Sequence, residues 1–285
     1  MANILIVGCG SIGLQLAEVL TAQGHYVMGL KRTPSALVLA NIDYIAADIA
    51  SEDQLKELST HFDVVYFIVS PDGRNPESYQ AVYGQGINNL VGHFKAVNAN
   101  PQWVFVSSTS VYGQTQGEWV DEDSVAEPEN VTSQFIRQAE QQLTDLSPQN
   151  IVVRFSGIYG PGREYLIRMA RQGSEVQQEP PYYTNRIHQR DCVGVLTYLL
   201  EQSLAGVPLE QFYLASDNDP APMYEVISWL AEQMSCKPPT VKVFDSMAQL
   251  NKRCNNQRLK DLGYEFIYPD YKSGYSELIK SIFVR

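Results

Sequence analysis

The chain has 285 residues, of which 44% are hydrophobic and 19% charged, and its net charge is -11 at neutral pH. That apolar share supports a sizeable core in one or two domains and excludes disorder as the dominant state. A diffuse negative charge repels nucleic acid and anionic membranes, so we expect neither as a partner. An anionic small molecule is still allowed, because a site can gather basic groups locally.

The 4 cysteines include no C-x-x-C pair, and the 4 histidines are scattered along the chain. This spacing predicts reduced thiols and no metal site. No apolar run reaches membrane-spanning length, and the N-terminus lacks the basic start and the cleavage site of a signal peptide. We therefore expect a cytoplasmic protein.

Short apolar runs alternate with amphipathic stretches through the first three quarters of the chain. Strands are expected over 4–7, 26–30, 64–69, 103–106, 151–155 and 211–215, and helices over 12–20, 52–58, 79–98, 135–146 and 193–202. Strands that alternate with helices predict an α/β fold, a Rossmann doubly wound parallel sheet.

The composition changes after Gly157, where Gly, Pro and Tyr become frequent. We expect a Rossmann domain over 1–156 plus about 188–216. A smaller C-terminal substrate-binding domain is expected over about 157–187 plus 217–285.

A glycine-rich turn follows the first predicted strand and opens the first predicted helix. It reads Gly8-Cys9-Gly10-Ser11-Ile12-Gly13, which fits G-x-G-x-x-G. Gly8 permits the tight turn, Gly10 lets a pyrophosphate approach the backbone, and Gly13 allows close packing of helix on strand. The helix N-terminus adds N–H groups and the positive end of a dipole. These six residues are therefore predicted to bind a dinucleotide.

The end of the second strand indicates which dinucleotide. NAD sites usually carry Asp or Glu here for the ribose hydroxyls, whereas this chain carries Lys31 and Arg32. Two cations suit a 2′-phosphate, which Arg can bind in a bidentate manner. We therefore predict that NADP(H) is preferred, with NAD(H) as the alternative.

The run Ser107-Ser108-Thr109-Ser110-Val111-Tyr112-Gly113 resembles the S-S-x-x-V-Y-G of the extended short-chain dehydrogenases/reductases, the NAD-dependent epimerase/dehydratase family. Further pieces follow in the family's order and cover essentially the whole chain. They are Asp48-Ile49, Asn89-Leu90, Arg154 with 157–163, Ile187-His188 with Asp191, and Leu262-Gly263-Tyr264. The chain is most similar to the atypical, YeeZ-like branch.

The resemblance implies roles for individual residues. It implies cofactor contacts for Asp48, Ile49, Val69 and Ser107. It implies substrate contacts for Ser108, Tyr159, Arg163, Arg186 and His188. Ser108 and Tyr112 are the catalytic candidates. The implied substrate is a sugar-like or anionic small molecule such as a nucleotide sugar, and the implied assembly is a homodimer.

The chain departs from the family at the residues that carry out proton transfer. The family uses Tyr and, four residues later, Lys, whose charge helps the phenol to act as a base. Thr132 and Ile136 stand at these positions, and neither side chain can replace them. Gly157 replaces the usual Asn, and Thr109-Ser110 replaces the Asp-Glu of dehydratases. The group that transfers the proton is therefore not assigned.

Two functions of different classes remain open. One is an NADP(H)-dependent epimerase or reductase. The other is a dinucleotide-binding sensor without catalytic activity, which the missing Tyr and Lys favour. Five arginines, at positions 163, 168, 171, 186 and 190, discriminate between them. If they line one cleft, an anionic substrate is expected, whereas scattering over the surface favours the sensor.

Overall fold

The computed structural model describes residues 1–33, 42–242 and 251–283. The chain forms two compact units, each assembled from separate segments. Unit 1 comprises Met1–Val111, Ala126–Arg154 and Val193–Tyr213. Unit 2 comprises Tyr112–Val125, Phe155–Cys192 and Leu214–Arg285.

Unit 1 is built on a seven-stranded sheet with the order β12-β7-β5-β4-β1-β2-β3. Its strands are β1 (Asn3–Val7), β2 (Tyr26–Lys31), β3 (Asp43–Ala46), β4 (Val64–Phe67), β5 (Gln102–Ser108), β7 (Ile151–Phe155) and β12 (Phe212–Ala215). The pairs β1–β2, β1–β4, β2–β3 and β4–β5 are parallel. The expected doubly wound Rossmann fold is confirmed.

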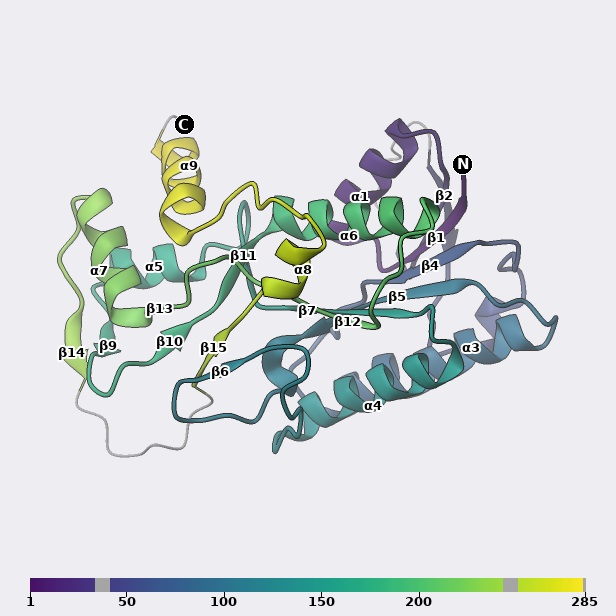
Figure 1. The fold of residues 1–285 in the computed structure, drawn as a ribbon, viewed down its shortest axis with the longest axis horizontal. Helices are drawn as coiled ribbons and strands as arrows, with labels where there is room; N and C mark the ends of the chain where they lie inside the picture. The colour runs from purple at the N-terminus through teal and green to yellow at the C-terminus, as the bar shows by residue number, and fades with distance from the viewer. Residues whose placement is uncertain (34–41, 243–250, 284–285) are drawn as a thin grey trace. The chain divides into compact units, whose positions relative to one another are not determined.

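Helices cover both faces of this sheet (Figure 1). One face carries α1 (Ser11–Ala22) and α6 (Gln189–Leu204), and the other carries α3 (Ile87–Lys95) and α4 (Val131–Leu146). The side chain of Gln23 just after α1 bonds to Glu201 on α6, and Gln142 on α4 bonds to Asn88 on α3. Strands β4 and β7 are buried at every position, and apart from Arg154 in β7 their residues are apolar or aromatic.

The stretch expected to be one long helix over 79–98 has a composite structure. It starts as α2 (Pro76–Tyr79), where the Asn75 side chain caps Ser78 N–H, continues as a π-helix η2 (Gln80–Gly86), and becomes α3. A Cβ at Gly86 would lie 2.6 Å from Ile49 Cδ1, so this glycine lets the helix approach the loop after β3. The helix expected over 52–58 is only a 3₁₀ turn, η1 (Glu52–Leu55).

Unit 2 is made of short strands and four helices in its described part. A second 3₁₀ turn, η3 (Thr109–Val111), ends the preceding segment of unit 1. The unit 2 elements are β6 (Glu118–Val120), β8 (Gly157–Tyr159), α5 (Tyr165–Gln172), β9 (Glu175–Gln177), β10 (Tyr183–Thr184), β11 (Arg186–His188), β13 (Ala221–Pro222), α7 (Met223–Gln233), β14 (Thr240–Lys242), β15 (Lys252–Cys254), α8 (Gln257–Asp261) and α9 (Tyr271–Phe283). Segment 112–125, expected in the Rossmann domain, clusters with this unit because β6 pairs with β15.

The C-terminal part of unit 2 is held by a buried carboxylate. Asp191 is fully buried and accepts hydrogen bonds from the Tyr264 hydroxyl at 3.0 Å, Ile267 N–H at 2.7 Å and Tyr268 N–H at 3.0 Å. Helix α9 then packs on β8, where the rings of Tyr159 and Tyr275 stack with centroids 4.3 Å apart. Among the described residues, no helix is both long and apolar enough to cross a membrane.

Gly274 is where α9 lies closest to Tyr159. A Cβ at this position would collide with the Tyr159 hydroxyl oxygen and lie 2.7 Å from Cζ. We expect Gly274→Ala to lower the free energy of unfolding by about 1–3 kcal/mol, because the overpacked ring has to move. Urea unfolding followed by circular dichroism measures the change.

The matched control is Gly92→Ala on α3, where a Cβ meets no atom within 4 Å. Alanine favours a helix over glycine, so this variant should be unchanged or about 1 kcal/mol more stable. Equal midpoints for the two variants would contradict the packing described for α9.

Candidate functional site

The predicted glycine turn lies between β1 and α1 and has no room for side chains at two positions. Gly8 has φ +99°, and a Cβ there would lie 2.7 Å from the carbonyl carbon of Ile68, just after β4. A Cβ at Gly13 would collide with the carbonyl oxygen of Gly8. The turn is fixed by the bonds Gly8 N–H to Leu30 O at 3.0 Å and Gly10 N–H to Gly8 O at 2.9 Å.

Gly10 is different, because a Cβ there would meet no atom within 4 Å. It is the N-cap of α1 and, lacking a side chain, gives the helix no capping bond. Gly10 and Ser11 are exposed, so the backbone is accessible where the N–H groups of the first helical turn lack intrahelical acceptors. These features fit a pyrophosphate bound at the helix N-terminus.

The other two turn residues point into the protein. Ile12 is 5% exposed, and Cys9 is fully buried with its thiol against Gly29 on β2. Burial raises the pKa of the Cys9 thiol to about 11, so the thiol is neutral and unreactive near neutral pH. Their contribution to a dinucleotide site is through the backbone.

The two predicted cations at the end of β2 have different surroundings. Arg32 forms a two-pronged ion pair with Asp72, with Nη1–Oδ2 and Nη2–Oδ1 distances of 2.6 Å each. Lys31 lies near Cys9. The positive charge of Lys31 lowers the pKa of the Cys9 thiol, but burial raises that pKa by more. Asp72 was not among the predicted site residues. The pair joins loops that follow two different strands, which sequence spacing alone does not reveal.

The residues predicted around the adenine lie after β3 and β4. Asp48 is half-buried and accepts the Ala50 N–H at 2.9 Å. Ile49 is 6% exposed and packs under Gly86. Val69 is half-buried, and its carbonyl accepts the Tyr83 hydroxyl at 3.2 Å. Of these three residues, Asp48 is the one with a polar side chain, and that side chain is partly accessible.

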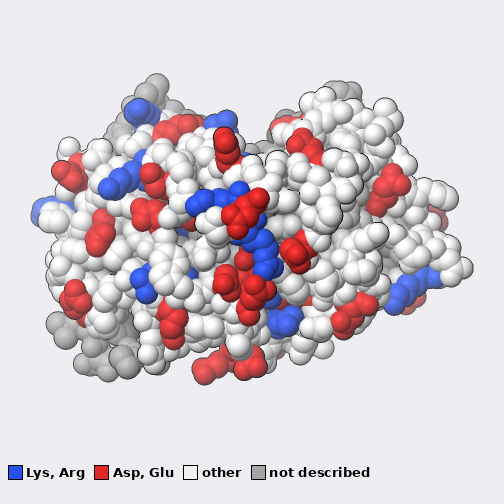
Figure 2. All heavy atoms as spheres, viewed as in Figure 1, with Lys and Arg blue, Asp and Glu red and all other residues white. Residues whose placement is uncertain are grey.

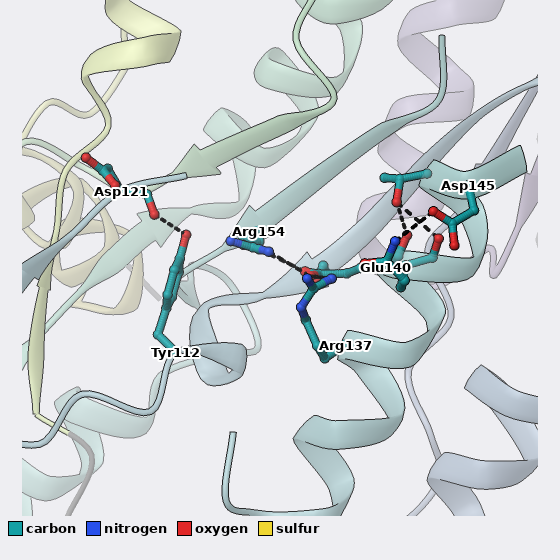
Figure 3. Close-up of polar contacts among 9 residues, drawn as sticks. Tyr112, Asp121, Arg137, Glu140, Asp145 and Arg154 are labelled. Carbon is teal, nitrogen blue, oxygen red and sulfur yellow. Dashed lines mark hydrogen bonds and ion pairs between the residues drawn. The ribbon is translucent and has the colours of Figure 1, made fainter. Parts of the chain in front are cut away.

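Ser107 belongs to a buried network that sequence reasoning missed. Its hydroxyl donates to Glu140 Oε1 at 2.6 Å, and Arg154 on β7 donates to both oxygens of the same carboxylate at 2.9 and 2.8 Å. Arg137, one turn earlier on α4, approaches Glu140 at 3.4 Å (Figure 3). Glu140 is fully buried and Arg154 is 2% exposed. The network fastens α4 to β5 and β7.

Helix α4 carries the positions of the family's Tyr and Lys. Thr132 Oγ1 donates to Asn130 Oδ1 at 2.6 Å, so this hydroxyl helps to cap the helix. Ile136 is 5% exposed. The structure thus shows an intact helix with no phenol and no ammonium group at these two positions.

Hydroxyl groups gather where β5 ends. Ser108 Oγ accepts the Ser110 N–H at 3.1 Å, which leaves the Ser108 hydroxyl hydrogen to be donated elsewhere. Ser133 on α4 donates to Ser110 at 3.1 Å. Tyr112 is fully buried, and its hydroxyl donates to the Asp121 carbonyl at 2.7 Å (Figure 3). This burial argues against contact between Tyr112 and a substrate, whereas Ser108 remains a candidate.

Tyr159 and His188 are register partners in the β8–β11 pair of unit 2. Their ring centroids lie 5.1 Å apart, and Tyr268 covers the other side of His188 at 4.1 Å. They are 3% and 5% exposed, so each needs a local rearrangement to touch a ligand. Burial lowers the pKa of His188 to about 4, which keeps its imidazole neutral at physiological pH.

The five arginines differ in their exposure. Arg163, Arg168, Arg171 and Arg190 are exposed, whereas Arg186 is 2% exposed. Arg186 donates to the carbonyls of Thr184 and Asp219 and lies 3.9 Å from Asp217. The predicted substrate contact of Arg186 therefore conflicts with its burial, because these bonds hold the guanidinium inside unit 2.

Asp217 is the most perturbed carboxyl in this part of unit 2. Burial raises its pKa to about 7, although the charge of Arg186 opposes the shift. Asp217 Oδ2, Arg186 Nε and the Tyr159 hydroxyl are buried without a hydrogen-bond partner.

Elsewhere on the molecule, acidic and basic side chains are interspersed over the face drawn in Figure 2. In the described ranges, no group of three or more His, Cys, Asp or Glu side chains could hold a metal ion.

Residues 4–210 match the model of the NAD dependent epimerase/dehydratase family. The chain belongs to this family. The match spans the glycine turn and the S-S-x-x-V-Y-G strand, so the resemblance noted in the sequence is confirmed. Among characterised sequences, the chain is similar to Protein YeeZ of Escherichia coli (strain K12), with 26% identity over 285 residues, 95% of this chain and 97% of that protein.

Solved structures support the same assignment. A structure described as a candidate NAD-dependent epimerase/dehydratase from Methylobacillus flagellatus is 35% identical, covers 99% of both chains and has a TM-score of 0.83. The Thermus thermophilus UDP-glucose 4-epimerase in complex with NAD is 17% identical, with 98% of both chains covered and a TM-score of 0.79. At that identity the second likeness shows the fold alone.

The Glu140 network can be tested by breaking it and then replacing it. Glu140→Leu leaves the Arg154 guanidinium buried without its carboxylate, so we expect a loss of about 3–5 kcal/mol of unfolding free energy. The double variant Glu140→Leu/Arg154→Met removes both charges and should recover most of that loss. Chemical denaturation of the three proteins measures both effects. A double variant that is less stable than the single variant would contradict this account.

The low pKa of His188 predicts a pH dependence of stability. Between pH 6.5 and about 4 the unfolded chain binds a proton at this position and the folded chain does not, so stability falls as the pH falls through this window. In the unaltered protein this lowers the free energy of unfolding by on the order of 3 kcal/mol, at about 1.4 kcal/mol per pKa unit. We expect this loss to be absent in His188→Gln. Urea unfolding at several pH values compares the two proteins. If the unfolding free energies of the two proteins change with pH in parallel, the pH dependence does not come from His188.

Proposed function

We propose that the protein binds a nicotinamide dinucleotide at the Gly8–Gly13 turn and acts as an epimerase or reductase on a sugar-like or other polar small molecule. Nucleotide sugars are the first class to test. Membership of the family and the shape of the turn support the proposal.

The observation that carries the proposal is the open space at Gly10. Gly8 and Gly13 serve the packing of the turn itself, and any tight strand-to-helix turn could need them. A Cβ at Gly10 would meet no atom within 4 Å, so the packing of the fold does not require a glycine at this position. A pyrophosphate that approaches the exposed backbone of α1 gives this glycine a purpose.

Lys31 and Arg32 support a preference for NADP(H), since both are cations at the strand end where the adenosine ribose lies in Rossmann sites. NAD(H) is the alternative. The likeness to the Thermus thermophilus epimerase, whose structure holds NAD, supports a dinucleotide of either kind. A bound nicotinamide supplies the hydride chemistry, and the protein supplies orientation and electrostatics.

The chain's own residues offer hydrogen bonds where the family usually places its Tyr. Ser108 can donate to a carbonyl or hydroxyl oxygen and so orient it. In unit 2, the predicted substrate-side residue with an accessible charge is Arg163, which the turn from Gly160 to Arg163 presents at the surface. A guanidinium suits a phosphate group.

A dinucleotide-binding sensor without catalytic activity is the second candidate. One observation favours it: Thr132 and Ile136 stand at the positions of the proton-transfer pair. The two candidates share the cofactor site and differ in turnover, so binding has to be measured first.

Titration of the cofactor-free protein with NADPH and NADH, followed by fluorescence or calorimetry, tests the site. We expect Gly10→Val to abolish binding of both, because its side chain fills the space that the pyrophosphate needs. Its thermal unfolding should stay close to that of the unaltered chain, since that space is empty in the fold. Gly92→Ala, remote in sequence and packing, is the control for both measurements.

Unchanged affinity in Gly10→Val would refute the cofactor site and the proposed enzyme together. If binding is lost as expected, the holoprotein is then mixed with nucleotide sugars, and absorbance of the reduced nicotinamide and product formation are followed. Turnover supports the enzyme, whereas tight binding without turnover over the series supports the sensor.

A further inference from the structure

We propose that Asp72 determines the choice of cofactor by holding Arg32, so that NADP(H) has to displace a carboxylate that NAD(H) leaves in place. The proposal rests on the proposed function, because it assumes a dinucleotide at the Gly8–Gly13 turn. It assigns a specificity role to a residue outside every motif in the sequence.

The order of the strands places this ion pair beside the glycine turn. Arg32 directly follows β2, and Asp72 lies in the loop after β4. Strand β1 lies between these two strands in the sheet and ends at Val7, directly before Gly8. Neighbouring strands are about 4.8 Å apart, so side chains from β2 and β4 must span about 10 Å to meet. They meet past the carboxyl end of β1, which is where the turn lies.

The backbone contacts of Gly8 support this placement. Gly8 N–H donates to Leu30 O, two residues before Arg32, and a Cβ on Gly8 would touch Ile68, four residues before Asp72. Both arms of the pair therefore begin at residues that contact the first glycine of the turn. The pair bridges the region that the adenosine side of a dinucleotide has to enter.

The geometry of the pair leaves Arg32 little capacity for a second anion. Both terminal nitrogens of the guanidinium contact Asp72, each at 2.6 Å, so the carboxylate occupies the outer edge of the guanidinium, one of the edges at which a phosphate can bind in a bidentate manner. The side chains are 56% and 68% exposed, so the pair is solvated and can open. A 2′-phosphate has to take the place of the carboxylate.

Charge distinguishes the two cofactors further. A second carboxylate, Asp48 after β3, also acts on Arg32 and raises the pKa of its guanidinium, although less than Asp72 does. A 2′-phosphate between these acids is repelled by both. A 2′-hydroxyl carries no charge and can donate to a carboxylate, as it does to the Asp or Glu at the end of β2 in NAD sites. Here the loop after β4 supplies that acid.

Asp72→Asn tests the proposal with dissociation constants for NADPH and NADH. We expect NADPH to bind about ten-fold more tightly than to the unaltered protein, because Arg32 is released and one repulsive charge is lost. NADH should bind equally or more weakly. Adding salt should reduce the gain for NADPH, because exposed charges are screened.

Arg32 provides the second arm of the experiment. Arg32→Ala should weaken NADPH binding, and the gain from Asp72→Asn should largely disappear in the double variant, since the acid acts through Arg32. Asp53→Asn is the matched control. Asp53 also forms an exposed 2.7 Å ion pair, with Lys56 just after η1, and removal of its charge should leave the ratio of the two affinities unchanged.

The outcomes separate this proposal from the one it rests on. If neither cofactor binds the unaltered protein, the dinucleotide site itself is wrong. If both bind and Asp72→Asn leaves the ratio of affinities unchanged, the site stands and the role of Asp72 is overturned. That role is overturned as well if Asp53→Asn shifts the ratio as much as Asp72→Asn does.

Discussion

At the turn from β1 into α1, Gly8 lies against the backbone of Ile68 and Gly13 lies against the backbone of Gly8. The geometry of the proposed cofactor site depends on these two close approaches. A Cβ on Gly8 would lie 2.7 Å from Ile68, and one on Gly13 would collide with Gly8 itself. The first contact fixes where the chain leaves β4, and so where Asp72 begins. The second seats α1 on the strand, which brings the exposed Gly10 to the helix N-terminus. These two contacts thus place both the exposed helix N-terminus of the proposed cofactor site and the carboxylate that pairs with Arg32.

A second constraint keeps the helix of the family's Tyr and Lys in place after both side chains have changed. Glu140 is bonded by Ser107 from β5 and twice by Arg154 from β7, with all three groups buried. Such a network is costly to break at one member, since the remaining charges lose their partners inside the protein. Helix α4 therefore retains its position for structural reasons, and its position is no argument for catalysis. The evidence that bears on catalysis is the replacement of the family's Tyr and Lys by Thr132 and Ile136.

Local rules predicted the sheet well. Strands β4 and β7 are buried at every residue, and their largely apolar sequences predicted them, although Arg154 interrupts β7; the glycine spacing predicted the turn. Prediction failed for the π-helix η2, whose last residue, Gly86, packs closely against Ile49, a residue far away in the sequence. Burial of Tyr112 and Arg186 was equally hidden, because their polar groups bond to backbone carbonyls, which residue types and spacing do not reveal. The Arg32–Asp72 pair could be predicted only with the order of the strands in the sheet, which the sequence does not show.

The division of the chain has a consequence for how it is synthesised. Unit 1 ends with Val193–Tyr213, and unit 2 takes in every residue from Leu214 onward together with two earlier segments. Neither unit can be completed while its last segment is still inside the ribosome. Strand β7 stays without its edge neighbour β12 until residue 215 has emerged. The sheet of a growing chain is thus incomplete for about three quarters of its synthesis, the period in which a chaperone can bind its unpaired edge.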